Sequence, residues 1–101
     1  MKLKSVLKEP LQEAEYKLYH QSFTSASQAA YDLAKKKGYT IDEDDWFSAV
    51  STGKSRGRPS VGKTNSFHVD LEKNGKKQRQ QLHFQVFGMQ SGTYELNAYV
   101  S

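Results

Sequence analysis

Cysteine is absent from this 101-residue chain, so disulfides, thiolate metal sites and cysteine nucleophiles are excluded. The sequence has no run of about 18 apolar residues, the length that a transmembrane helix needs. Its first residues also lack the apolar segment of a signal peptide. We therefore expect an intracellular protein that does not span a membrane.

Acidic residues are scarce in the second half of the chain. Residues 1–51 hold seven Lys/Arg and eight Asp/Glu, whereas residues 52–101 hold eight Lys/Arg and three Asp/Glu. The net charge of +4 therefore arises wholly in the second half. A localised basic excess favours an anionic partner, with nucleic acid (DNA before RNA) ahead of an acidic protein.

The length allows one domain. We expect a basic lead over 1–9, flexible or removed by processing, followed by a domain over 10–101. In the first half of that domain, apolar residues recur at helical spacing. The predicted elements are helices over 10–20, 25–37 and 41–51, a basic loop over 52–65, and strands over 66–73, 76–87 and 93–100.

Polar residues mark the expected helix boundaries. Ser25 with Gln28, and Thr40 with Glu43, have the spacing of capping boxes. Lys35, Lys36 and Lys37 are interpreted as a helix terminus, where cations complement the helix dipole, rather than as a binding patch. The acids at 42–45 are interpreted as charge in the first turn of a helix, because their spacing matches no calcium loop. The residues of this last helix expected to face the core are Trp46, Phe47 and Val50.

Asn74-Gly75 is a strong hairpin signal and predicts a two-residue type I′ turn. Continuous pairing from this turn predicts Glu72 opposite Lys77, Asp70 opposite Arg79, His68 opposite Gln81, and Phe67 opposite Leu82. One face of the two strands is then apolar, and the agreement of register with pattern supports the hairpin. The predicted apolar face consists of Phe67, Val69, Leu71, Leu82, Phe84 and Val86.

Gln90-Ser91-Gly92 predicts a three-residue loop with Gly92 in the left-handed region. This loop pairs Val86 with Leu96, Phe84 with Ala98 and Leu82 with Val100. The expected fold is α+β, with two to three N-terminal helices packed on one face of a three-stranded antiparallel β-meander.

The basic loop matches two motifs. Gly57, Gly62, Lys63 and Thr64 satisfy the phosphate-binding loop pattern. That motif needs a buried strand before it and a helix after it, whereas a strand pattern follows here, so nucleotide hydrolysis is disfavoured. Arg56-Gly57-Arg58-Pro59 resembles the core of an AT-hook, in which an extended segment places arginines in a narrow A·T minor groove. A solvated basic loop is the competing interpretation.

The predicted nucleic-acid-binding residues come from the loop and the hairpin: Lys54, Arg56, Arg58, Lys63, Lys76, Lys77 and Arg79. Aromatic and histidine side chains on the outer sheet face are candidates for a partner surface, or for stacking on bases: His68, His83, Phe87 and Tyr99. An ordinary solvated sheet face is the alternative. The expected register does not bring His68, Asp70 and His83 together, so we expect no metal site. With no nucleophile motif present, we expect a protein that is not an enzyme and uses no cofactor.

Two stretches of the body, residues 38–47 and 94–100, resemble small uncharacterised proteins of large tailed phages, marine ones included. The first residues, Met1-Lys2 through Leu7-Lys8-Glu9, are similar to capsid-targeting peptides of phage internal head proteins. The resemblance implies cleavage after Glu9 and a location in the cytoplasm of an infected bacterium or in the virion. It implies no defined activity.

The leading hypothesis from the sequence is a basic phage accessory protein that binds nucleic acid without catalysing a reaction. The alternative is a protein-interaction module, either a virion component or an inhibitor of a host protein, that uses the exposed sheet face.

Overall fold

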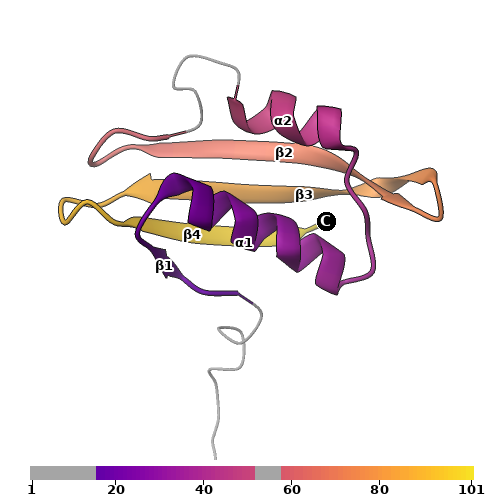
Figure 1. Ribbon diagram of the computed structural model, residues 1–101, viewed down its shortest axis with the longest axis horizontal. Coiled ribbons are helices and arrows are strands. Elements are labelled where there is room, and N and C mark those ends of the chain that lie inside the picture. Colours follow the sequence, from indigo (N-terminus) through magenta and orange to yellow (C-terminus); the bar gives the residue numbers. More distant parts are fainter. Residues whose placement is uncertain (1–15, 52–57) are drawn as a thin grey trace, which may run out of the picture.

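An antiparallel sheet with two helices on one face organises the chain in the computed structural model, which describes residues 16–51 and 58–101 (Figure 1). The elements, in chain order, are β1 (Tyr19–His20), α1 (Phe23–Lys36), α2 (Glu43–Ser51), β2 (Thr64–Lys73), β3 (Lys76–Gly88) and β4 (Tyr94–Val100). The strand order is β1-β4-β3-β2. The α+β class is therefore as predicted, but the sheet has four strands instead of three.

The fourth strand comes from residues that were predicted to be helical. Residues 10–15 of the predicted helix 10–20 lie outside the described ranges, and residues 16–18 are not helical. Tyr19 pairs with Glu95 in β4, and the carbonyl of Leu18 accepts a hydrogen bond from the Leu96 N–H at 2.8 Å. The edge of β4 thus takes this segment as a strand, which is tertiary pairing overriding a weak helical pattern.

The first described helix begins earlier than the predicted Ser25–Gln28 capping box. Ser22 is the N-cap, in an extended conformation, and its hydroxyl accepts a hydrogen bond from the Ser25 N–H at 3.0 Å. Gln28 donates to Asp32 instead of reaching back to a cap. The early start allows the ring of Phe23 to contact that of Phe67 in β2, with 5.7 Å between the ring centroids.

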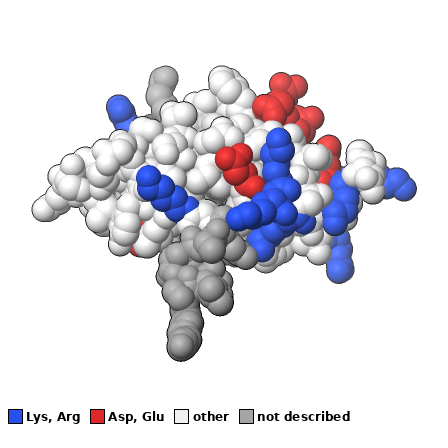
Figure 2. Space-filling model, turned by 60° about the horizontal axis from the view of Figure 1, so that its bottom comes forward, with Lys and Arg blue, Asp and Glu red and all other residues white. Residues whose placement is uncertain are grey.

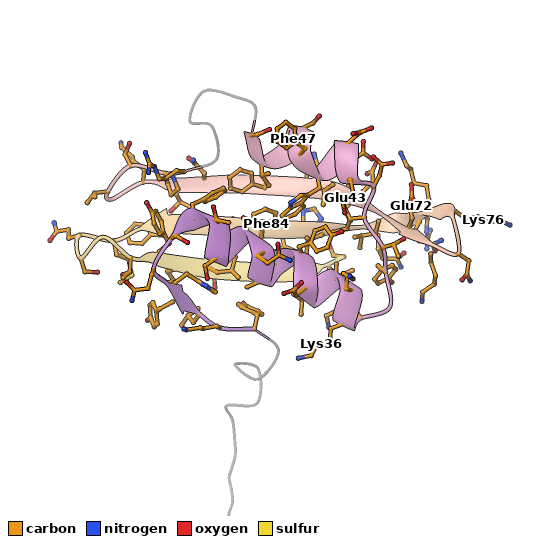
Figure 3. The ribbon with its side chains drawn as sticks, in the orientation of Figure 1. Lys36, Glu43, Phe47, Glu72, Lys76 and Phe84 are labelled. Atoms are coloured by element: carbon orange, nitrogen blue, oxygen red, sulfur yellow. The ribbon has the colours of Figure 1, made fainter. Side chains whose placement is uncertain are left out.

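The second helix is capped by Asp42, so the predicted Thr40–Glu43 capping box is also wrong. The Asp42 carboxylate accepts from the Asp45 N–H at 3.0 Å. The backbone of Thr40 is already used, because it exchanges two hydrogen bonds of 2.8 Å with Glu72. Phe47, predicted to face inward, is 67% exposed and points away from the sheet (Figure 3).

The core lies between the helices and the inner sheet face. Its largest fully buried side chain is Phe84, whose ring lies 4.7 Å from Phe67 and 5.5 Å from Trp46, centroid to centroid. Alanines at helical spacing let α1 lie close to the sheet. The buried apolar residues are Ala26, Ala30, Leu33, Ala34, Ile41, Val69, Leu71, Leu82, Phe84, Val86, Leu96 and Ala98.

The β2–β3 hairpin follows the predicted register only near its turn. Asn74 and Gly75 have φ of 54° and 78°, the positive values of a type I′ turn, and Glu72 pairs with Lys77. An irregularity between Asp70 and Glu72 then shifts the register by two residues. The three predicted pairs beyond it are wrong: Asp70 faces Gln81, His68 faces His83 and Phe67 faces Phe84. Because side chains alternate with a period of two, this shift leaves the inner face apolar.

The β3–β4 connection agrees with the prediction. Val86 pairs with Leu96, Phe84 with Ala98 and Leu82 with Val100. Gly92 has φ of 88°, in the left-handed region that favours glycine. Local turn chemistry therefore determined this register correctly.

Candidate nucleic-acid interface

The basic residues of the hairpin lie at one end of the sheet. Lys76 follows the turn, and Lys77 pairs with Glu72 across the hairpin. Arg79 lies in the part of β3 where the register shifts, and it borders a shallow hollow with Gln80 and Ser101. The predicted Lys76, Lys77 and Arg79 thus share the turn end of the sheet.

The fold brings the lysines at the end of α1 to the same end of the molecule. The double pairing of Thr40 with Glu72 holds the chain after α1 against β2. The Lys73 ammonium lies 4.9 Å from the centre of the Tyr39 ring, a cation–π contact, and that of Lys35 lies 5.8 Å from the centre of the Tyr31 ring. Figure 3 shows Glu72 and Lys76 at this end, whereas Lys36 lies below α1, nearer the middle of the view. The Lys73 ammonium also lies 3.8 Å from where a Cβ of Gly38 would be, directly after the lysine run.

We name this surface the lysine end. It consists of Lys35, Lys37, Lys73, Lys76, Lys77 and Arg79. In the space-filling view, blue side chains gather toward one end of the face shown (Figure 2). The sequence interpretation of Lys35–Lys37 as a helix terminus holds locally, since they are at or just beyond the last turn of α1. It missed their proximity to the hairpin. The run of three lysines was the only signal in the sequence.

Acidic groups border the lysine end. The Lys77 ammonium lies 3.1 Å from the Asp70 carboxylate, and both side chains remain partly exposed. The first turn of α2 carries Glu43, Asp44 and Asp45. Figure 2 shows red side chains next to the blue ones. A polyanion would therefore contact the lysine end on the side away from α2.

The described part of the basic loop, from residue 58 on, lies at the opposite end of the sheet. The carbonyl of Lys63 accepts from the Gly88 N–H at 3.0 Å, and Arg58 shares a hollow with Gly92 in the β3–β4 loop. Since β3 runs from Lys76 to Gly88, its 13 residues separate the two ends by about 40 Å. Lys54 and Arg56, the other two predicted loop residues, lie outside the described ranges.

The phosphate-binding loop pattern lacks its structural context. Thr64 begins β2, so a strand and not a helix follows Lys63. The loop also approaches β3 closely: a Cβ added at Gly88 would lie 2.6 Å from the Ser60 carbonyl oxygen. This contact and the Gly88–Lys63 hydrogen bond place Ser60 and Lys63 against the end of β3. Arg58, earlier in the loop, borders a hollow with Ser22 and Phe23 at the start of α1.

The outer sheet face carries a row of three rings. His68 lies directly opposite His83, not opposite Gln81 as predicted, and His83 lies opposite Tyr99 on the other side. The His83 and Tyr99 rings are stacked, with centroids 5.0 Å apart and planes at 13°, while His68 lies 6.3 Å from His83. Phe87 does not join the row, because it is four residues farther along β3.

Stacking within the row limits what the face can bind. Because the His83 and Tyr99 rings are stacked on each other, one face of each ring is occupied and cannot stack on a base. Ser66, Gln85 and the row border a hollow of about 240 Å³. The row therefore offers fewer free ring faces for base stacking than its three rings would offer separately.

Asp70 has a lowered pKa. Its carboxylate accepts a hydrogen bond from the Gln81 side chain at 2.7 Å, and Lys77 adds a second favourable contact, so the charged form is stabilised and the pKa falls below its ordinary value. The stability that this gives is present above the ordinary carboxyl pKa and is lost as pH falls through the lowered one.

Replacing Gln81 by alanine should raise the Asp70 pKa toward its ordinary value, because the largest cause of the shift is removed. A ¹³C NMR titration of the Asp70 carboxyl carbon measures this. Gln85→Ala is the matched control, since Gln85 is also on β3 and faces Asn97 and Ser66. An Asp70 pKa that does not change in Gln81→Ala would contradict this account.

The described residues 16–51 and 58–101 contain no group of three or more His, Asp or Glu side chains placed to hold a metal ion. Within the same ranges, neither helix has the length and apolar character needed to cross a membrane.

The fold and these surfaces define a small α+β protein with a basic end. Comparison of the chain with protein-family models, with curated proteins and with solved structures gave no match.

Proposed function

We propose that this protein binds nucleic acid electrostatically through the lysine end, without catalysing a reaction. The observation that carries the proposal is the convergence of α1 and the β2–β3 hairpin. The two segments are about forty positions apart in the sequence, and the fold brings their cations to one end of the sheet. Clustered cations on one surface are the electrostatic footprint of a nucleic-acid-binding protein.

In such binding, the protein contacts the phosphate backbone and not the bases. Lysine ammonium groups act as point charges that displace condensed counterions, so affinity falls steeply with salt and depends little on sequence. The loop residues Lys54, Arg56, Arg58 and Lys63 form a second contact in the proposal. Their AT-hook-like core would add a preference for A·T minor grooves. The resemblance to phage proteins makes phage DNA, in an infected bacterium or in the virion, the nucleic acid that we propose.

Fluorescence anisotropy tests the proposal, with a labelled A·T-rich duplex, a G·C-rich duplex and a single strand, each titrated at 50 and 200 mM salt. We expect binding that weakens steeply between the two concentrations. Arg56→Ala/Arg58→Ala should remove any A·T preference and leave the remaining, sequence-independent affinity. No binding to any of the three at 50 mM salt would overturn the proposal.

A further inference from the structure

One edge of the sheet is formed by β2, because β2 is the last strand in the order β1-β4-β3-β2. Gln81 exchanges hydrogen bonds of 2.8 and 3.1 Å with Ser101, on the β4 side. Odd-numbered residues of this part of β3 therefore direct their backbone groups toward β4, and even-numbered ones toward β2. The even-numbered residues Leu82 and Phe84 pair with Val69 and Phe67 of β2. In an antiparallel ladder, the β2 residues that alternate with Phe67 and Val69 direct their backbone N–H and C=O groups away from β3.

Three residues of β2 consequently have backbone N–H and C=O groups that point sideways from the sheet, away from β3: Ser66, His68 and Asp70. Farther along the same edge, Glu72 shows what can occupy such positions, since Thr40 pairs with it through two hydrogen bonds. For Ser66, His68 and Asp70, residues 16–51 and 58–101 supply no such backbone partner. An open edge of this kind is a template for pairing with another strand.

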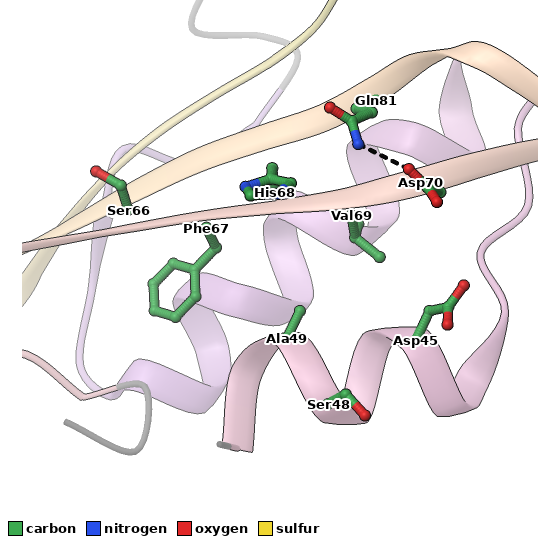
Figure 4. A pocket seen from close by; sticks show the side chains of 9 residues that line it. All are labelled: Asp45, Ser48, Ala49, Ser66, Phe67, His68, Val69, Asp70 and Gln81. Carbon is green, nitrogen blue, oxygen red and sulfur yellow. Dashed lines mark hydrogen bonds between the residues drawn. The ribbon is translucent and has the colours of Figure 1, made fainter. Parts of the chain in front are cut away.

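A hollow of about 530 Å³ lies beside this edge, between β2 and α2. Figure 4 shows Asp45, Ser48 and Ala49 on the helix side, with Phe67 and Val69 pointing from β2 toward the helix. A strand placed against β2 would direct alternate side chains toward this partly apolar wall. The hollow thus supplies contacts for side chains as well as for the backbone.

The charge around the hollow is unequal along its length. Asp45 and Asp70 lie at one end, and Ala49 and Phe67 toward the other (Figure 4). Asp44 and Glu43 add negative charge in the same turn of α2. An extended segment with cationic side chains at one end and apolar side chains at the other is complementary to this arrangement.

A second copy of the chain fits less well. In a two-fold symmetric pairing of two β2 edges, each α2 would lie beside the other on the same face, because the same patch is used twice. Each α2 carries Glu43, Asp44 and Asp45 and no basic residue, so bringing two copies together adds like charge that neither helix compensates. A slender peptide avoids this repulsion.

We propose that the edge of β2 binds an extended basic peptide segment of a partner protein, which adds a fifth strand to the sheet against Ser66, His68 and Asp70. Backbone hydrogen bonds supply affinity, and Asp45 with the apolar wall selects the sequence. This site adjoins the lysine end, because Asp70 pairs with Lys77, but none of the residues lining the hollow belongs to the lysine end, and peptide binding does not require nucleic-acid binding.

The test uses a fluorescein-labelled eight-residue peptide with blocked termini, two lysines at one end, and alternating valine and threonine after them. Hydrogen exchange of the protein is followed by NMR with and without the peptide. We expect the His68 and Asp70 amides to exchange rapidly in the free protein and at least tenfold more slowly with saturating peptide. The Phe67 and Val69 amides, which are bonded to β3, are the internal control.

Two matched pairs separate strand addition from general charge attraction. The same peptide N-methylated at alternate amides keeps its charge but cannot pair with the edge, and it should bind at least tenfold more weakly. Asp45→Lys should weaken binding by a similar factor. Asp44→Lys makes an equal change in net charge on the same turn but outside the hollow, and it should leave the affinity within about twofold.

Equal binding of the methylated peptide, equal effects of the two aspartate variants, or no detectable binding would overturn the proposal. Protection of His68 and Asp70 that appears without peptide and grows with protein concentration would also overturn it, in favour of a second copy. Lys35→Gln/Lys76→Gln leaves the hollow unchanged, so this variant should bind the peptide as tightly as the unchanged protein does. Peptide binding is therefore tested independently of nucleic-acid binding.

Discussion

Replacing Phe84 by alanine is expected to lower the free energy of unfolding by about 3–5 kcal/mol. The side chain is fully buried between the helices and the sheet, and its ring contacts those of Phe67 and Trp46. Truncation removes apolar contact area and leaves a cavity that these neighbours cannot fill without leaving their own positions. Since small domains have only about 5–15 kcal/mol of stability in total, much of this reserve would be lost.

Urea unfolding followed by the fluorescence of Trp46, the single tryptophan, measures this effect. With a urea dependence of about 1–3 kcal/mol per molar, the midpoint should fall by about 2 M. Phe47→Ala is the matched control, because Phe47 is the neighbour of Trp46 and is 67% exposed, and it should change stability by no more than about 0.5 kcal/mol.

If Phe84→Ala does not fold, Phe84→Leu keeps the prediction testable, since this smaller truncation should still cost about 1–2 kcal/mol. Equal midpoints for the Phe84 and Phe47 variants would show that the core is not where the structure places it.

Replacing Lys35, Lys73 and Lys76 together by glutamine is expected to weaken nucleic-acid binding on the order of 100-fold at 50 mM salt. These three lysines come from both segments that form the lysine end. Each lost phosphate contact should reduce the slope of log K against log salt by about one unit. The reason is that fewer counterions are released when fewer phosphates are neutralised.

The affinity is measured by anisotropy of the same labelled duplex at several salt concentrations. Lys17→Gln, an exposed lysine beside β1 and outside the lysine end, is the matched control and should change the affinity by less than tenfold. If the triple variant keeps the salt slope of the unchanged protein, the lysine end does not contact phosphate. A loss in Arg56→Ala/Arg58→Ala instead would assign binding to the loop.

Local signals predicted the second half of the fold well. The Asn74-Gly75 turn and the loop at Gly92 require backbone conformations that few residues adopt, so their sequences are informative. The alternation of apolar residues then assigned Val69, Leu82 and Phe84 to the inner face. The two-residue register shift was not predictable from this pattern, because every even shift preserves the faces.

The first half was predicted less well, because several of its residues form backbone hydrogen bonds with residues that are far away in the sequence. Tyr19 and His20 form a strand, and Leu18 bonds to Leu96, only because β4 offers an edge. Thr40 could not serve as a helix cap once its backbone had paired with Glu72, 32 positions away. Competing local signals were present at both sites, and pairing across the sheet decided between them.

By itself, the sequence determined the α+β class, the type I′ hairpin, the apolar face of the sheet and the basic excess of the second half. These follow from turn chemistry, periodicity and charge, which act over a few residues. Only the tertiary structure decided that Lys35 and Lys73 lie at one end while Arg58 and Lys63 lie at the other. It also decided that the edge of β2 lies beside a hollow with Asp45 and Asp70 at one end and an apolar wall at the other. Such juxtapositions depend on how the strands pair and where the helices cross them, and no local pattern encodes that arrangement.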